Sequence, residues 1–466
     1  MKSDSPPKTS LRWISYGLLA VAALAASLLF FGWARLNTPN DLDIFFTCDV
    51  HGRLVPCGCF SGQMGGLTRI ATLIGGVPRE SSLKVDVGGA LDGVADYQVI
   101  QYRYLLRAFH EIGYEAANLG HPEARLSAAQ LREIKASSPV PLLSANLLER
   151  ASGAPLFDAY RIVQRGAYRI ALVGVMDEHI PSENLGEGLA VEPMQAALSR
   201  LLPTLRKAAD FIVLLAFTDE ARLRQLARDD YEIQVILGGN VSQPAQHLEH
   251  LNCSYILYTT NQSRALGSLV LSFLGPGKLH DKSGEIVLVA DTIAEDPAIR
   301  KLDDEYRAEI RQTKLQIDDP AHPRDDVVPG VKSAAQYVGS ESCMQCHVSA
   351  GKTWQDSRHA QASRALLQAG ADADPNCLGC HTVGFGAPSG YRRDAPKRLT
   401  DVGCESCHGP GSVHVAQHAA GTEVTTHFRP LGVADCQKCH HGEFSRPFDW
   451  SAFWPQIQHG LEESKK

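Results

Sequence analysis

Four copies of the pattern Cys-x-x-Cys-His lie in the last third of this chain, and they constrain its folding more than any other feature. Their cysteines are Cys343, Cys346, Cys377, Cys380, Cys404, Cys407, Cys436 and Cys439. The pattern is typical of covalent c-type haem attachment, because two cysteines form thioethers and the adjacent histidine binds the iron. The histidines in that position are His347, His381, His408 and His440. Zinc sites also use paired cysteines, but they do not require histidine at the next position each time. The sequence therefore predicts four c-type haems.

The second axial ligand of these irons can be predicted from composition. The chain has 5 Met, and the only one in this region, Met344, lies inside a haem motif. Six further histidines remain: His359, His414, His418, His427, His441 and His459. We therefore expect histidine on both sides of most irons, and low reduction potentials. One haem without a second histidine would stay open to a small molecule.

The N-terminus carries an uncharged stretch at residues 13–33, and Lys2, Lys8 and Arg12 precede it. A helix of this length is about 31 Å long, enough to cross a bilayer core. The positive charges predict a cytoplasmic tail at 1–12 and a single-pass protein of the inner membrane, with its bulk in the periplasm. A cleaved signal peptide is the alternative.

The region 42–296 alternates short apolar runs with helical stretches, which predicts an α/β domain. Expected strands include 43–47, 83–87, 141–146, 170–176, 211–217, 235–238, 255–260 and 269–274. Expected helices include 66–74, 97–112, 128–136 and 194–209. A charged helix and a Pro-rich linker are expected at 297–335. The domain at 336–466 should be mainly helical with haem in its core. The formal charge of −7 disfavours nucleic acid as a partner.

Several segments of the region 336–466 resemble the tetrahaem cytochrome c-554 family of nitrogen-cycle bacteria. They are Tyr337-Val-Gly-Ser, Trp354 with His359-Ala, the run from Cys404 to His414, and Phe448 with Trp454 and His459-Gly. The resemblance implies that His359, His414 and His459 are distal ligands to other motifs' haems. His427 and His418 are candidates for the fourth. It also implies electron donor and acceptor proteins, or a quinone, as partners.

The segment Thr47-Cys-Asp49-Val-His51-Gly follows an expected strand and resembles the first motif of calcineurin-like metallophosphoesterases, including 5′-nucleotidases. Gly65-Gly66, Leu119-Gly120, Ser144-Ala-Asn146 and Gly238-Gly239 follow in the family's order. The resemblance implies a four-layer α/β/β/α sandwich and a metal pair bridged by a carboxylate.

Most of the positions that would bind those metals are replaced in this chain. The replacements are Gly89 for the bridging Asp, His121 and Pro122 for the Asn-His pair, Phe217 for a His, and Asn240 and Ser242 for the closing His-x-His. Asp49 and His51 are left as residual ligands. Because two metals are not held without their bridge, we expect no phosphoesterase activity.

Cys57 and Cys59 stand where the resembled family has no ligands. They are candidates for a strained, redox-labile disulfide, for metal binding, or for a reactive thiolate. A purely structural disulfide is the alternative.

The sequence thus predicts a membrane-anchored periplasmic electron-transfer protein whose nucleotidase-like domain serves in binding. Two alternatives stay open. The first is a bifunctional protein with an active metal-dependent phospho- or sulfur-ester hydrolase. The second is a sulfur-compound or thiol oxidoreductase that couples Cys57 and Cys59 to the haems.

Overall fold

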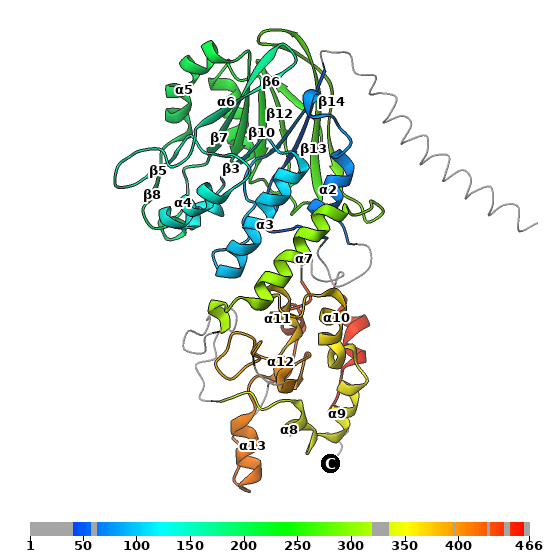
Figure 1. Ribbon diagram of the computed structural model, residues 1–466. Coiled ribbons are helices and arrows are strands. Elements are labelled where there is room, and N and C mark those ends of the chain that lie inside the picture. The colour runs from blue at the N-terminus through cyan, green and yellow to red at the C-terminus, as the bar shows by residue number, and fades with distance from the viewer. Residues whose placement is uncertain are drawn as a thin grey trace, which may run out of the picture.

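The computed structural model describes residues 41–56, 63–318, 335–394, 397–425, 429–441 and 448–460. These residues form an upper α/β domain (41–318) and a lower helical C-terminal domain (335–460), as Figure 1 shows. No helix in this part of the chain is long and apolar enough to cross a membrane. The predicted span at 13–33 lies outside the described residues. Because no membrane-spanning helix is found in the described residues, the structure does not support the predicted location as a single-pass protein of the inner membrane, and that prediction is corrected.

Two six-stranded sheets face each other in the α/β domain. The first has the order β14-β13-β1-β2-β3-β4 and the second the order β11-β12-β10-β9-β7-β6. The first consists of β1 (Asp41–Thr47), β2 (Ser82–Asp86), β3 (Ala116–Asn118), β4 (Leu142–Leu143), β13 (Ala265–Gly275) and β14 (Lys278–Leu288). The second consists of β6 (Tyr160–Arg165), β7 (Tyr168–Met176), β9 (Phe211–Phe217), β10 (Val235–Gly239), β11 (Glu249–Leu251) and β12 (Ser254–Tyr258). A small ribbon joins β5 (Leu147–Glu149) to β8 (Leu189–Val191).

The central strands are parallel and buried, as expected of apolar runs that are covered on both sides. Strand β9 is buried along its whole length, and β7 and β10 flank it in parallel. The side-chain amide of Asn118 links the two sheets, because its Nδ2 atom donates 2.8 Å hydrogen bonds to the carbonyl oxygens of Val87, directly after β2, and of Val175 in β7. The carboxyl ends of these strands therefore meet at one edge of the sandwich.

Helices cover the outer faces of the sandwich (Figure 1). On one side lie α5 (Met194–Ala208) and α6 (Glu220–Asp229), and on the other α2 (Leu67–Ile74) and α3 (Asp96–Ile112). The short α4 (Ala128–Ser137) begins at Ser127, whose side chain accepts a hydrogen bond from Gln130 N in the usual N-cap manner. The observed architecture is the four-layer α/β/β/α sandwich that the sequence predicts.

Helix α7 (Pro297–Gln312) lies between the two domains and contacts both (Figure 1). On the α/β side, the rings of Tyr104 and Tyr306 meet edge to face at 6.0 Å, and the Tyr104 hydroxyl donates to Glu309 at 2.7 Å. On the other side, Arg307 donates to the carbonyl of Ala369 at 2.6 Å. The segment expected to be charged and helical therefore packs into the fold rather than only linking its parts.

Arg393 of the C-terminal domain fastens the end of α7. Its guanidinium donates to the carbonyls of Ile310 and Thr313 at 2.6 and 2.7 Å. It also forms two hydrogen bonds of 3.0 Å with the carboxylate of Asp318. Because these groups are the last carbonyls of a helix and a buried carboxylate, one cation satisfies several acceptors at once.

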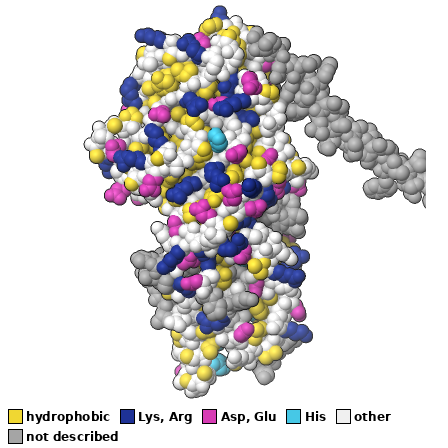
Figure 2. All heavy atoms as spheres, viewed as in Figure 1, with side chains coloured by type: hydrophobic (Ala, Val, Ile, Leu, Met, Phe, Trp, Pro, Cys, Tyr) yellow, Lys and Arg dark blue, Asp and Glu magenta, His cyan; other side chains and the backbone are white. Residues whose placement is uncertain are grey.

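The C-terminal domain consists of short helices joined by loops. They are α8 (Ser340–Met344), α9 (Val348–Gln355), α10 (Ala362–Ala369), α11 (Pro375–His381), α12 (Cys404–His408), α13 (Ser412–Ala419), α14 (Val433–Cys436) and α15 (Trp450–Phe453). Basic and acidic side chains are interspersed over the visible face of both domains (Figure 2).

Candidate functional site

Three pairs of histidine rings face each other in the C-terminal domain. The ring centroids of His347 and His414 are 6.2 Å apart, those of His359 and His440 6.0 Å, and those of His408 and His459 5.9 Å. Each pair joins a motif histidine to a predicted distal one. A metal bound at about 2.0–2.1 Å from a ring nitrogen lies about 3 Å from the ring centroid, so two ligands on opposite sides have centroids about 6 Å apart. The spacing fits one iron between each pair.

The motifs place their side chains through single helical turns. His347 N donates to Cys343 O at 3.0 Å, and His440 N donates to Cys436 O at 2.8 Å. The turn that includes His381 begins at Asp374, whose side chain caps the helix. The Nδ1 atom of His381 lies 2.8 Å from the carbonyl oxygen of Ala362, an arrangement that fixes the ring and directs Nε2 away from it.

Burial favours the neutral form of three of the six paired rings. It lowers the pKa of His359, His408 and His440, and neighbouring histidines lower the first two further. Neutral imidazole is the form that binds a metal ion. Burial thus favours the metal-binding form of His359, His408 and His440.

Thiols of different motifs also contact each other. Cys343 and Cys404 share a side-chain hydrogen bond, as do Cys380 and Cys439. Burial raises the pKa of Cys407 to about 11, and the charge of Cys436 adds to the shift. The motifs therefore follow one another in space in the order first, third, fourth and second.

Three of the predicted residues, Cys57, Cys59 and His427, lie outside the described residues. His418 is described, and its ring lies 5.5 Å from that of His414. His418 therefore lies next to His414, which is itself a distal candidate. The observed ring contacts do not place His418 opposite a motif histidine.

In the α/β domain, Asp49 and His51 lie in the loop after β1, at the edge where the strands end. The Nε2 atom of His51 is 3.8 Å from Asp49 Oδ1, and its Nδ1 atom is 3.8 Å from Asp92. Thr260 donates a 2.8 Å hydrogen bond to Asp49. Burial raises the pKa of Asp49, while the Thr260 hydrogen bond and the His51 charge act in the opposite direction.

The ring of Phe217 fills the space next to Asp49. A side-chain carbon placed on Gly89 would lie 3.0 Å from this ring and 2.4 Å from Asp49 Oδ1. A carbon on Gly120 would lie 2.9 Å from the same ring. Gly89 also has a φ of 76°, which other residues adopt only under strain. The structure therefore leaves no room for a ligand at position 89.

Glu123 closes the floor of this region. Its carboxylate accepts hydrogen bonds from the backbone amides of Gly89, Leu91 and Gly120 at 3.1, 2.8 and 2.8 Å. The side chain is fully buried. Its oxygens are thus committed to the backbone, and the glutamate holds the loops that follow β2 and β3.

Comparison with known proteins bears on both halves of the chain. Residues 342–409 match the family described as cytochrome c554 and c-prime. Over 93 residues the chain is 40% identical to cytochrome c-554 of Nitrosomonas europaea, which covers 16% of this chain and 40% of that protein. The C-terminal domain is a cytochrome c554 family domain.

The α/β domain is similar to 5′-nucleotidases. The rat 5′-nucleotidase is 24% identical over 348 residues, covering 66% of this chain and 57% of that protein. The 5′-nucleotidase precursor of Thermus thermophilus superposes with a TM-score of 0.51 at 23% identity, covering 58% of this chain and 59% of its own. A sulfate thiohydrolase of the same species gives a TM-score of 0.51 at 17% identity and covers 59% and 61%. The chain thus spans less than two thirds of these relatives.

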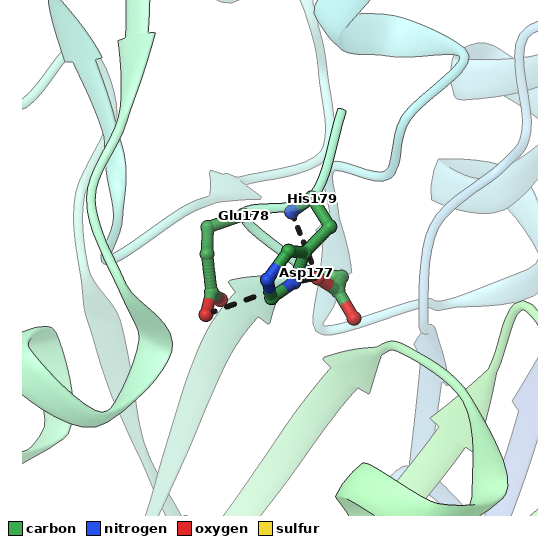
Figure 3. A group of neighbouring side chains, drawn as sticks. All are labelled: Asp177, Glu178 and His179. Atoms are coloured by element: carbon green, nitrogen blue, oxygen red, sulfur yellow. Dashed lines mark hydrogen bonds and ion pairs between the residues drawn. The ribbon is translucent and has the colours of Figure 1, made fainter. Parts of the chain in front are cut away.

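One cluster in the phosphoesterase-like domain was not anticipated from the sequence. Asp177, Glu178 and His179 follow β7, and one potential ligand atom from each lies within 4.8 Å of the others (Figure 3). The only available signal was three consecutive ligand-type residues after a predicted strand.

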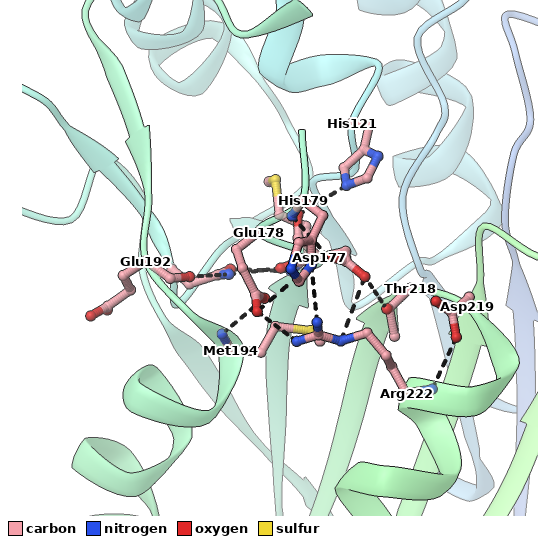
Figure 4. A network of polar contacts seen from close by, with 11 residues as sticks. His121, Asp177, Glu178, His179, Glu192, Met194, Thr218, Asp219 and Arg222 are labelled. Atoms are coloured by element: carbon pink, nitrogen blue, oxygen red, sulfur yellow. Dashed lines mark hydrogen bonds and ion pairs between the residues drawn. The ribbon is translucent and has the colours of Figure 1, made fainter. Parts of the chain in front are cut away.

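Arg222 already balances the charge of this cluster. It lies 2.6 Å from the Glu178 carboxylate, 3.6 Å from that of Asp177 and 3.0 Å from His179 Nδ1 (Figure 4). Thr218 donates to Asp177 at 2.7 Å. The arrangement is a satisfied ion-pair network, in which a guanidinium stands where a metal would have to bind.

Proposed function

We propose that this chain is an electron-transfer protein that carries four covalent c-type haems, with a phosphoesterase-like domain that binds a ligand and does not hydrolyse it. The observation that supports the proposal most is the set of three histidine pairs about 6 Å apart, each of which contains one motif histidine. Haem supplies an iron that gains and loses single electrons.

The residues that would hold these groups follow from the contacts. The eight motif cysteines would form the thioethers, and His347, His381, His408 and His440 would be the proximal ligands. The distal ligands would be His414 opposite His347, His359 opposite His440, and His459 opposite His408. Since both ligands are imidazoles, the potentials should be low. The fourth distal ligand stays a prediction, with His427 and His418 as candidates.

The contacts between motif thiols suggest the order in which the sites exchange electrons. Cys343 and Cys346 belong to one end of the series, and Cys377 and Cys380 to the other. The second motif also lies next to α7, because Arg307 and Arg311 of that helix form hydrogen bonds with Ala369 and Asp372, shortly before the motif. Burial raises the pKa of Asp374, which caps the motif's helix, to about 6, and the nearby charges of Arg307 and Arg53 act in the opposite direction. Arg53 lies two residues after His51, so the α/β site is near this end.

The proposed lack of hydrolysis rests on how the α/β site is filled. A bridged metal pair requires a carboxylate at position 89, where Asp49 and the Phe217 ring leave no space. The Glu123 carboxylate is already occupied by hydrogen bonds from three backbone amides. The residues present do not fit two metals.

Mass spectrometry of the protein would test the haem count. We expect four haem additions, and a mature protein with fewer would exclude the motif that stays empty. Replacing His359, His414 or His459 by Ala should leave attachment intact and convert one haem per variant from low to high spin. His250→Ala, on β11 of the α/β domain, is the matched control. Unchanged spectra in all three distal variants would exclude the ligand assignment.

Assays on nucleotides and on generic phosphate and sulfate esters, with Mn, Mg, Zn or Co supplied, would test the second half of the proposal. We expect no metal-dependent turnover. Turnover that disappears in Asp49→Ala would contradict the proposal and favour the bifunctional hydrolase.

A further inference from the structure

A polar cavity remains open beside the filled metal position of the phosphoesterase-like domain. Its volume is about 520 Å³, and its wall includes Asp49, His51, Asn240, Ser242, Thr260 and Gln262. Cavities of a few hundred Å³ are the size that small organic ligands occupy. The space is far larger than a single ion needs, so a molecule of several atoms would fit it.

The backbone around this cavity is held in an uncommon conformation. Eight residues other than glycine have a positive φ in the described chain, and five of them line the cavity. They are Asp49, His51, Asn240, Asn261 and Gln262, with φ of 52°, 46°, 63°, 89° and 53°. Each such residue costs on the order of 1 kcal/mol or more, and such residues concentrate at ligand sites. The concentration at one cavity, after the metal ligands were replaced, indicates that the cavity itself is in use.

The charges at the cavity oppose an anionic ligand. Within the described residues no Lys or Arg lines it. Asp49 forms part of its wall. Asp86 is buried close enough to Asp49 and to Glu123 for its charge to interact with both. His51 lies between the carboxylates of Asp49 and Asp92, at 3.8 Å from each. A phosphate or sulfate would meet carboxylates and lack the cationic donors that bind such groups.

The hydrogen-bonding groups favour a ligand that donates. The Asp49 carboxylate on the cavity wall can only accept hydrogen bonds. The Gln262 Oε1 atom has no hydrogen-bond partner in the described structure, but it is enclosed, so a ligand would reach it only after this side chain turns. The Thr260 hydroxyl already donates to Asp49. An ammonium group offers three donors and no acceptor. No aromatic side chain lines the cavity, so the ring faces that bind quaternary ammonium groups are missing from its described wall.

We propose that this cavity binds a small organic amine in its protonated form, with the ammonium group against Asp49 and its other polar groups against Asn240 and Gln262. The inference rests on the proposed loss of the metal pair, and it names the class of ligand that the α/β site takes. The amide side chains of Asn240 and Gln262 suit hydroxyl or amino substituents on such a ligand, because amides both donate and accept.

Titration calorimetry on the full-length, haem-loaded protein tests the proposal. The probes are ethanolamine, putrescine and glucosamine, with inorganic phosphate and AMP as anions and Ca²⁺ and Mn²⁺ as metal ions. We expect saturable binding of at least one amine and none of phosphate or AMP. Asp49→Asn, which keeps the shape of the side chain, should weaken amine binding by roughly tenfold or more.

Gln262→Leu should weaken amine binding severalfold. The matched control is Asp219→Asn, because it makes the same chemical change at the cap of α6, where Asn also caps well. No amine binding at about 10 mM, binding that Asp49→Asn leaves unchanged, or binding of metal ions or anions in place of amines would overturn the proposal. Haem content and ester turnover are measured on the same samples, so a failure here is distinguishable from a failure of the proposed function.

Discussion

The two domains of this protein are stabilised in different ways. In the α/β domain whole strands such as Phe211–Phe217 are buried, and one continuous apolar core runs through both sheets. In the described part of the C-terminal domain the buried apolar side chains form two small groups. They are Leu366, Ala371, Leu378 and Phe385, and Tyr337, Val383 and Leu399. One half of the chain thus folds around its own apolar side chains, and the other around the groups that its cysteines and histidines would bind.

The largest expected effect comes from withholding haem. Because the apolar groups of the C-terminal domain are too small to offset its conformational entropy, we expect that domain to lose its fold entirely, as metal-dependent domains do. The α/β domain should keep a cooperative melting transition. Limited proteolysis with haem-loaded protein as control measures this, and equal resistance of both forms would contradict the comparison.

The next largest effect should come from Arg393→Ala at the junction of the domains. This side chain is 11% exposed and pairs with an Asp318 that is equally buried. Removing one partner of a buried ion pair costs about 3–5 kcal/mol. We expect the two domains to melt separately in the variant.

Arg392→Ala is the matched control for that experiment, because Arg392 pairs with the exposed Asp394. Such surface pairs contribute about 0–1 kcal/mol. Equal effects of the two substitutions would show that the contact with α7 does not couple the domains.

A smaller effect is expected at Glu115 of the α/β domain. Burial acts to raise the pKa of this carboxyl, but hydrogen bonds from Arg79 and Arg165 outweigh it, and the pKa is lowered. Glu115→Gln should reduce the free energy of unfolding by about 2–3 kcal/mol at neutral pH.

The pH dependence of the Glu115 effect has a definite sign. A carboxyl whose pKa is lowered in the folded state stabilises the fold above its unfolded pKa, and this contribution is lost as pH falls through the folded pKa. Denaturant melts of wild type and Glu115→Gln should therefore converge in acid. A difference that grows in acid would exclude the ion pair as its source.

The smallest effect should follow from returning one metal ligand to the α/β domain. Phe217→His supplies a ligand, but position 89 still lacks the bridging carboxylate. We expect Mn²⁺ to leave the melting temperature of the variant within error of the metal-free value, since a ligand stabilises only what it binds. Wild type is the control. A melting temperature that rises with Mn²⁺ concentration in the variant alone would show that one substitution is enough to restore metal binding.

The sequence was most informative where its pattern was strongest. The buried strand at 211–217 is predicted with its observed bounds, because a continuous apolar run leaves few alternatives. Strand β14 (Lys278–Leu288) is missed, since most of its residues are exposed or half-buried and it pairs only at the edge of the sheet. Helix α6 (Glu220–Asp229) is missed because its mean hydropathy is low and only three of its residues are buried.

For the candidate sites, the chemistry was predictable and the geometry was not. Each proximal histidine can be predicted from the motif alone, because it directly follows the second cysteine. Which distal histidine faces which motif depends on how distant segments of the chain meet, as with His347 and His414 or His408 and His459. The cavity beside Asp49 also needed coordinates, because its walls come from the ends of strands far apart in the sequence.

Helix α7 determines where this chain can be cut into separately folding pieces. A protein that stops at residue 296 would uncover the apolar surface of α2 and α3 against which Leu302 and Tyr306 are buried. Large uncovered apolar patches promote aggregation. A protein that stops after Asp318 would keep that surface covered, although Arg393 would no longer satisfy the helix end. Separate study of the two domains therefore depends on treating α7 as the last helix of the first domain.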